Sequence, residues 1–149
     1  MMRAITIRGG KGGVDALEVQ SVPRPELRSG QVLVRVRAAG INRPDLLQRA
    51  GRYPPPPGAS EILGLEVAGE IAGVGAGVER WREGDRVTAL LPGGGYAEYA
   101  LVDARHALHI HGNDQIVGNV YGDGDIGPDL TPGQQDRFLD YVRQGGLSG

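Results

Sequence analysis

Four consecutive prolines at positions 54–57 constrain the fold of this chain more than any other stretch. Each proline fixes its backbone φ and lacks a backbone donor, so the run can be neither the interior of a helix nor a central strand. We therefore predict a stiff, extended surface loop. Such a loop would hold Tyr53, which directly precedes it, in a fixed place.

A short helix is predicted just before the prolines. Pro44 suits a first helical turn, and Gly51 suits the position that ends a helix. Asn42 then lies where a strand ends and the helix begins, which is a position that favours asparagine as the capping residue.

The rest of the chain is predicted to be mainly β. Its 149 residues include 26 glycines and 10 prolines, and a hydrophobic content of 40% suffices for one core. Alternating apolar and polar residues predict strands at 2–8, 17–22, 31–41, 61–71, 86–91 and 96–102. Within 61–71, Gly64 and Gly69 indicate bulges or close approaches of two backbones. Short strands joined by glycine and proline turns are typical of a small, closed or partly open barrel.

Charge and composition restrict the partners. Sixteen basic and eighteen acidic side chains give a net charge of −2, so nucleic acid and anionic membranes are not expected partners. No cysteine is present, which excludes disulfides and thiolate zinc sites. The sequence lacks both a membrane-length apolar stretch and the apolar core of a signal peptide. A cytoplasmic protein that binds a small molecule is the expectation.

The stretch NRPDLLQRAGRYPPPPGASEILGLEVAGE, followed by GVGAGVERWREGDRV and LLPGGGYAEY, resembles a known family. It is similar to the NADPH:quinone oxidoreductases of the zinc-free medium-chain dehydrogenase/reductase superfamily. The resemblance runs over about residues 2–108 and implies one domain, 1–108, with a GroES-like, partly open β-barrel and short helices. It also implies NADPH as cofactor and hydride transfer to a small quinone or enone.

The zinc-binding positions of that superfamily are altered in this sequence. Zinc-dependent members place a cysteine and a histidine where this chain has Asn42 and Leu65. Neither residue is a suitable ligand for zinc, which prefers sulfur and imidazole. The resemblance is therefore to the zinc-free branch, and no metal is expected.

The resemblance also implies the residues of a site. Asn42 would hold the nicotinamide carboxamide, and Tyr53 would line the pocket and reach cofactor or substrate. Gly94, Gly95 and Tyr96 would border the same cleft on the substrate side. Structural alternatives stay open: Asn42 caps the helix, Tyr53 packs on the prolines, and Tyr96 packs in the interior.

A nucleotide-binding domain is not expected in this chain. Gly73, Gly75 and Gly77 superficially suggest a dinucleotide loop, but a charged turn and a strand follow them where a helix should begin. We expect a tight β-turn there and no Rossmann domain. A cleft with one wall is then expected not to be catalytic alone.

Residues 109–149 depart from the family and form a tail of unknown origin. A helix is predicted near 132–144, with Thr131 as its N-cap. Truncation, gene fusion, a reading-frame artefact and an engineered chain all remain compatible with this tail. Two groups of residues are candidate metal sites: His106, His109 and His111, and the aspartates Asp123, Asp125 and Asp129 of a degenerate calcium loop. For both, a solvated surface segment is the preferred interpretation.

Two functions follow from these observations. The chain is either the substrate-side domain of an NADPH-dependent quinone oxidoreductase, truncated or fused, or a non-enzymatic scaffold or interaction module, with calcium binding in the tail as an option. A barrel of this family normally packs against a second domain. We therefore expect an exposed apolar patch and homo-oligomers formed through it.

Overall fold

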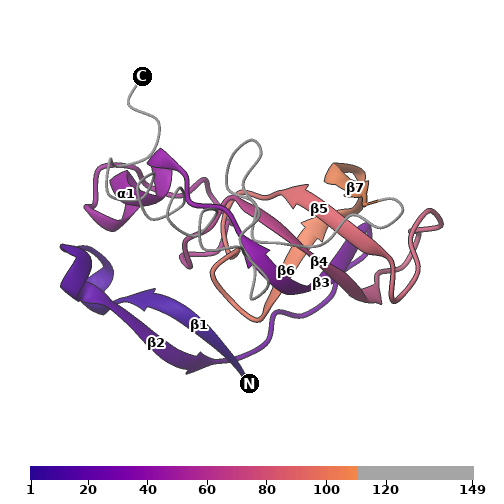
Figure 1. Ribbon diagram of the computed structural model, residues 1–149, viewed down its shortest axis with the longest axis horizontal. Coiled ribbons are helices and arrows are strands. Elements are labelled where there is room, and N and C mark those ends of the chain that lie inside the picture. The colour runs from indigo at the N-terminus through magenta and orange to yellow at the C-terminus, as the bar shows by residue number, and fades with distance from the viewer. Residues whose placement is uncertain (111–149) are drawn as a thin grey trace, which may run out of the picture.

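The computed structural model describes residues 1–110 and arranges them in two antiparallel sheets (Figure 1). The strands are β1 (Met2–Ile7), β2 (Leu17–Val22), β3 (Gln31–Ala39), β4 (Glu66–Val74), β5 (Arg86–Leu90), β6 (Tyr99–Asp103) and β7 (Ala107–His109). The α-helix α1 spans Arg43–Arg49, and short 3₁₀ helices span Arg8–Gly10, Val14–Ala16 and Ala104–His106. The expected mainly β fold with short helices is confirmed.

The larger sheet has the strand order β6-β3-β4-β5-β7, with all neighbours antiparallel. Its inner face carries the core, because alternate residues of each strand point to the same side. The fully buried side chains are Val32, Val34, Val67, Val87 and Val102. Trp81 closes this core: it is 3% exposed, its Nε1 donates to the Ala104 carbonyl at 2.9 Å, and its ring centroid lies 4.2 Å from that of His109.

Close backbone approach shapes β4. The register between β3 and β4 shifts between Val36 and Ala38, opposite Gly69. A Cβ on Gly69 would collide with the Arg35 carbonyl oxygen, so the expected close approach at this glycine is confirmed. The expected strand at 61–71 is wrong at its start, because β4 begins at Glu66.

The late starts of β4 and β6, relative to the expected strands, have one cause. Gly64 has φ +107° and packs against the backbone of Gly95, so residues 61–65 bond to the loop at 91–96 and do not extend β4. The strand expected at 96–102 begins only at Tyr99. The three residues before it instead connect the two sheets.

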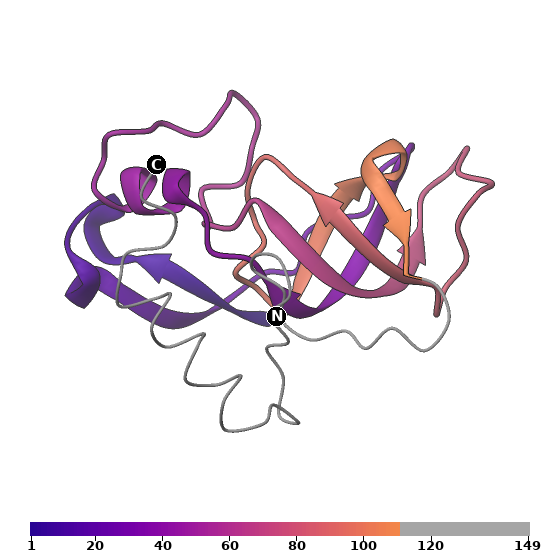
Figure 2. The same cartoon turned by 45° about the horizontal axis from the view of Figure 1, so that its top comes forward.

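The smaller sheet is the hairpin of β1 and β2, which lies with α1 at the end of the molecule away from β5 and β7 (Figures 1 and 2). The Ile5 N–H donates to the Tyr96 carbonyl at 2.8 Å, and the Glu98 N–H donates to the Arg3 carbonyl at 3.0 Å. At the hairpin tip, the Gly12 N–H donates to the Arg49 carbonyl of α1 at 2.8 Å.

No helix within residues 1–110 is both long enough and apolar enough to cross a membrane. Nor do these residues contain a βαβ unit, since every paired strand is antiparallel. The expected helix near 132–144 and the expected calcium loop lie outside the described residues.

Candidate functional site

Asn42 lies at the junction between β3 and α1. Its extended backbone, with φ −123° and ψ 153°, makes it the N-cap of α1. The Asn42 N–H donates to Asp45 Oδ2 at 2.9 Å. The helix ends as the sequence predicts, because Gly51 has φ +77° and its N–H donates to the Gln48 carbonyl at 3.0 Å. The start of α1 therefore holds Asn42 by its backbone.

The Asn42 side chain faces β4. Its Nδ2 is 3.4 Å from Oε2 of Glu66, the first residue of that strand. This carboxylate lies over Gly40, where a Cβ would collide with it. A donor–acceptor distance of 3.4 Å is long for a hydrogen bond. Asn42 Nδ2 is thus only weakly bonded, and since it carries two N–H donors it can donate to a second partner.

Asp45 completes this junction and was not singled out from the sequence. It is 2% exposed, and its Oδ2 accepts from the Tyr96 hydroxyl at 2.7 Å as well as from Asn42. Its Oδ1 is buried and has no hydrogen-bond partner within residues 1–110. One local signal could have found it: an acid three residues after an N-cap asparagine is the spacing of a capping box.

The glycine loop before β6 packs backbone against backbone. The Gly94 N–H donates to the Ile62 carbonyl at 2.7 Å, and the Gly95 N–H donates to the Gly64 carbonyl at 3.0 Å. The Tyr96 ring covers Gly64, where a Cβ would lie 2.7 Å from Tyr96 Cδ1. A side chain at Gly64 or Gly95 would force the two segments apart, because its Cβ would collide with the backbone of the other segment.

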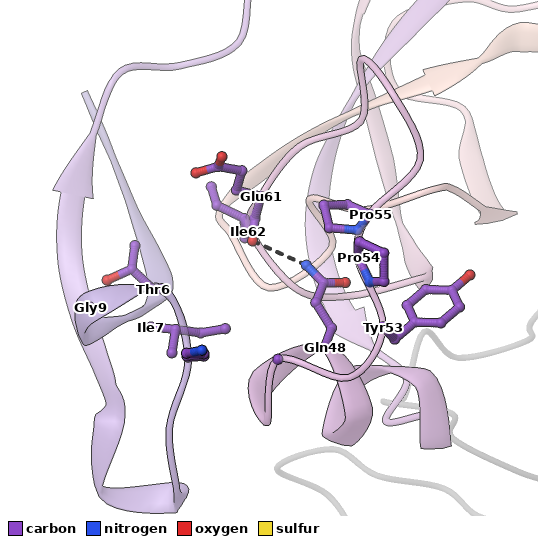
Figure 3. Close-up of a pocket in the computed structure, with 12 residues that line it drawn as sticks. Thr6, Ile7, Gly9, Gln48, Tyr53, Pro54, Pro55, Glu61 and Ile62 are labelled. Atoms are coloured by element: carbon purple, nitrogen blue, oxygen red, sulfur yellow. Dashed lines mark hydrogen bonds between the residues drawn. The ribbon is translucent and has the colours of Figure 1, made fainter.

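Tyr53 lies on the proline loop, 38% exposed, at the edge of a cavity of about 550 Å³. We call this cavity the hairpin pocket; it lies between the tip of the β1–β2 hairpin and the proline loop (Figure 3). Figure 3 shows the Tyr53 ring directed away from Thr6 and Ile7, beyond the prolines. Gln48, 7% exposed, spans the interior with its Nε2 3.3 Å from the Glu61 carbonyl oxygen.

The structure thus divides the residues expected to form one cleft. Asn42, Gly95 and Tyr96 gather around residues 64–66, whereas Tyr53 lines the hairpin pocket. Gly94 lines a different cavity of about 650 Å³, and Ile62 lines both cavities. The roles assigned to these five residues stay predictions.

One ion pair links the hairpin to the segment before β6. Glu98 accepts from the Arg3 backbone N–H at 2.8 Å and from its guanidinium at 2.9 and 3.1 Å. The backbone hydrogen bond from Arg3, followed by the guanidinium bonds, lowers the pKa of the Glu98 carboxyl. This pairing fixes β1 beside the segment that carries Tyr96.

The histidines do not converge within the described part of the chain. His106 ends a 3₁₀ helix and His109 stacks on Trp81, while His111 lies outside the described residues. Within residues 1–110, no group of three histidine, cysteine or acidic side chains could hold a metal ion.

Comparison with known proteins agrees with this architecture. The model of the alcohol dehydrogenase GroES-like domain matches residues 28–112. The chain belongs to this family. It is 43% identical over 113 residues to a quinone oxidoreductase of Lama guanicoe, covering 73% of this chain and 33% of that relative.

Solved structures of the family superpose on the GroES-like chain as well. A quinone oxidoreductase of Pseudomonas syringae gives a TM-score of 0.68 at 31% identity, covering 77% of this chain and 35% of that one. A mycobacterial protein solved in complex with NADPH gives a TM-score of 0.65 at 29% identity, covering 76% of this chain and 33% of that one. The resemblance to quinone oxidoreductases of the medium-chain superfamily is confirmed, and the chain spans about a third of the length of these relatives.

Proposed function

We propose that this GroES-like domain is the substrate-side part of an NADPH-dependent quinone oxidoreductase, which transfers hydride to quinones or enones. The observation that carries the proposal is the position of Asn42. Its backbone is fixed at the start of α1, and the Nδ2 of its side chain makes one long hydrogen bond, to Glu66. An amide placed in this way can exchange hydrogen bonds with the carboxamide of a nicotinamide. A cytoplasmic location belongs to the same proposal.

The described residues fit only the nicotinamide end of NADPH. The glycines at 73, 75 and 77 lead into a turn between antiparallel β4 and β5, with φ +79° at Gly77, and not into a helix. Residues 1–110 therefore lack the βαβ unit, with its glycine-rich turn into a helix, that binds a dinucleotide pyrophosphate. A nucleotide-binding domain would have to supply that half of the site, and NADPH, when bound, supplies the hydride.

The work of this domain is then binding and orientation. Quinones are electron-poor and accept hydride without a Lewis acid, provided that donor and acceptor are held close together. In this proposal Asn42 orients the nicotinamide, and Tyr53 with the backbone of Gly94 and Gly95 forms the substrate wall. Tyr96 acts indirectly, by holding α1 in position, because its hydroxyl already donates to Asp45.

A titration of the 149-residue chain with NADPH, followed by calorimetry with NADH as control, tests the cofactor part of the proposal. Asn42→Ser is the informative variant, because serine also caps helices but lacks the amide. Loss of NADPH affinity in Asn42→Ser at unchanged thermal stability supports a cofactor role. Equal affinity in wild type and Asn42→Ser leaves Asn42 only the capping role.

A chimera tests the whole reaction. Residues 1–110 would replace the equivalent third of the Pseudomonas syringae quinone oxidoreductase, and NADPH-dependent reduction of a benzoquinone would be measured. We expect activity that falls about tenfold or more in Asn42→Ser, since removal of a positioning hydrogen bond costs on that order. A folded chimera that binds NADPH but reduces no quinone would contradict the proposal.

The expected self-association rests on two exposed leucines. Leu90 on β5 and Leu108 on β7 are 68% and 60% exposed, and both line one open cavity of about 450 Å³ on the outer face of the sheet. In the scaffold alternative these leucines form the contact between copies. Sedimentation of the wild type and of the double variant Leu90→Ser/Leu108→Ser tests this contact. Self-association should be weaker in the double variant only if the copies meet through this face.

A further inference from the structure

The hairpin pocket is a preformed cavity with rigid walls. Its hairpin side is clamped to α1 in both directions, because the Gly12 N–H donates to the Arg49 carbonyl at 2.8 Å and Arg49 Nε donates to the Gly12 carbonyl at 3.3 Å. Its opposite side includes Pro54 and Pro55, whose backbones have little freedom. A volume of about 550 Å³ lies within the usual range for small-molecule sites.

Most of the wall is apolar, and the rings of Pro54 and Pro55 form part of it. Ile7 from the hairpin faces Ile62 and the two prolines across the cavity (Figure 3). The buried amide of Gln48 ties the back of the pocket to the Glu61 carbonyl, and this bond keeps the wall in place. Such walls favour a planar, mainly apolar ligand, such as an aromatic ring system.

One cation is fixed at this cavity. Lys11 is the single lysine of the sequence, and its alkyl chain packs against Gly51, where a Cβ would lie 2.8 Å from Lys11 Cδ. No carboxylate within residues 1–110 forms an ion pair with Lys11. Lys11 lines the pocket, and its ammonium group, without an ion pair in this part of the chain, is available to a ligand.

The surrounding hairpin tip is also basic. Arg8 Nη2 donates to the Asp15 carbonyl at 2.8 Å, and Arg49 bonds the Gly12 carbonyl, so neither guanidinium is neutralised through these bonds. With Lys11 they face two carboxylates, Asp15 and the exposed Glu61 on the pocket wall. The field at this end is therefore positive, in a chain whose net charge is −2.

We propose that the hairpin pocket binds a planar, mainly apolar ligand that carries one anionic group, of which an aromatic carboxylate is the simplest example. The anion pairs with Lys11, and the ring lies between Ile7, Ile62 and the prolines. Asn42 and Tyr96 do not line this pocket, and Tyr53 borders it with its ring directed away from Thr6 and Ile7, so the site is separate from the proposed nicotinamide position. The proposal does not depend on hydride transfer.

The test is a titration of the 149-residue chain with 2-naphthoate, followed by backbone amide shifts in two-dimensional NMR. The neutral 2-naphthamide serves as the matched probe, because it has the same ring and no charge. We expect saturable shifts at residues 7–11, Gly51 and Ile62, and an affinity for 2-naphthoate about threefold or more above that for the amide, as for a partly exposed charge pair.

Three variants assign the charge. Lys11→Gln should weaken 2-naphthoate binding about threefold and leave 2-naphthamide unchanged, while Lys11→Arg should keep most of the affinity. Glu61→Gln should strengthen naphthoate binding, because it removes a like charge from the wall. Arg28→Gln, at the other cavity, is the control and should have no effect. The amide spectrum of each variant also shows whether it is folded.

Several results would overturn the proposal. Equal affinity for the charged and neutral probes, or naphthoate binding unaltered by Lys11→Gln, would remove the role of the anion. Shifts confined to residues 90–103, or shifts that do not saturate, would show that the hairpin pocket is not the site.

Discussion

The five-stranded sheet and the end formed by the hairpin, α1 and the proline loop are held together by different forces. The sheet buries a continuous apolar core, closed by Trp81. Within residues 1–110 the two buried polar side chains, Asp45 and Gln48, both lie on α1. The sheet, which we call the frame, is thus stabilised mainly by the hydrophobic effect. The candidate site lies in the other region, where hydrogen bonds, helix caps and prolines stabilise the structure.

The largest expected effect is in the frame. Trp81→Ala should lower the free energy of unfolding by about 3–5 kcal/mol, because it leaves a large cavity and an unpaired Ala104 carbonyl. Urea unfolding monitored by circular dichroism measures this. Val19→Ala, on the exposed side of the hairpin, is the control and should change stability by less than about 0.5 kcal/mol. Similar losses in both variants would erase the distinction between the two regions.

A second variant tests the close approach inside the frame. Gly69→Ala should destabilise the protein by about 3 kcal/mol, since the new methyl group meets the Arg35 carbonyl of the neighbouring strand. Gly73→Ala on the same strand is the matched control, because its methyl meets no backbone atom: its tight contact is with the flexible end of Leu27, and Leu33 Cβ lies at an ordinary contact distance. Thermal unfolding of the pair would contradict the model of β4 if both variants were equally stable.

A third variant moves to the other region. Asp45→Ala should cost about 2 kcal/mol, since the Tyr96 hydroxyl and the Asn42 N–H lose their shared acceptor. In a double-mutant cycle with Tyr96→Phe the two changes should be non-additive. Additive losses would mean that the Asp45–Tyr96 hydrogen bond does not connect α1 to the glycine loop.

The smallest expected effect concerns the Arg3–Glu98 pair, which links the hairpin to the segment before β6, and the dependence of this pair on pH. Hydrogen bonds from Arg3 lower the pKa of Glu98 below its ordinary value of 4.5 in the folded state. This contribution to stability is present above that ordinary value and is lost as the pH falls through the lower, folded pKa. Glu98→Gln should therefore flatten the stability profile below about pH 4.5, with Glu18→Gln on β2 as control. If the stability of Glu98→Gln fell at acid pH as steeply as that of the wild type, Glu98 would not contribute to the link between the two regions.

Features of both regions are predicted well from the sequence where their determinants are local. Alternation in β3 and the proline run are visible within a few residues, and so is the end of α1 at Gly51. The starts of β4 and β6 are missed, since both depend on the contact of Gly64 with Gly95, which lie far apart in the sequence. A glycine in an apolar run indicates an irregularity but does not say which segment approaches it.

The candidate site is predictable in part for the same reason. Asn42 stands out through its position before Pro44, and the spacing to Asp45 is that of a capping box. The hydrogen bond from Tyr96 to Asp45 joins residues 51 positions apart, and no pattern within either segment indicates it. The hairpin pocket is equally invisible, because the docking of Gly12 on Arg49 creates it.

The burial of Trp81 also determines how this protein can be observed. It is the single tryptophan of the chain and lies in the core of the five-stranded sheet, beside His109. Indole emission therefore reports on that sheet alone, and loosening of the hairpin or the proline loop would leave the emission maximum in place. An emission transition that follows the loss of far-ultraviolet ellipticity would be the optical signature of the hairpin end opening first.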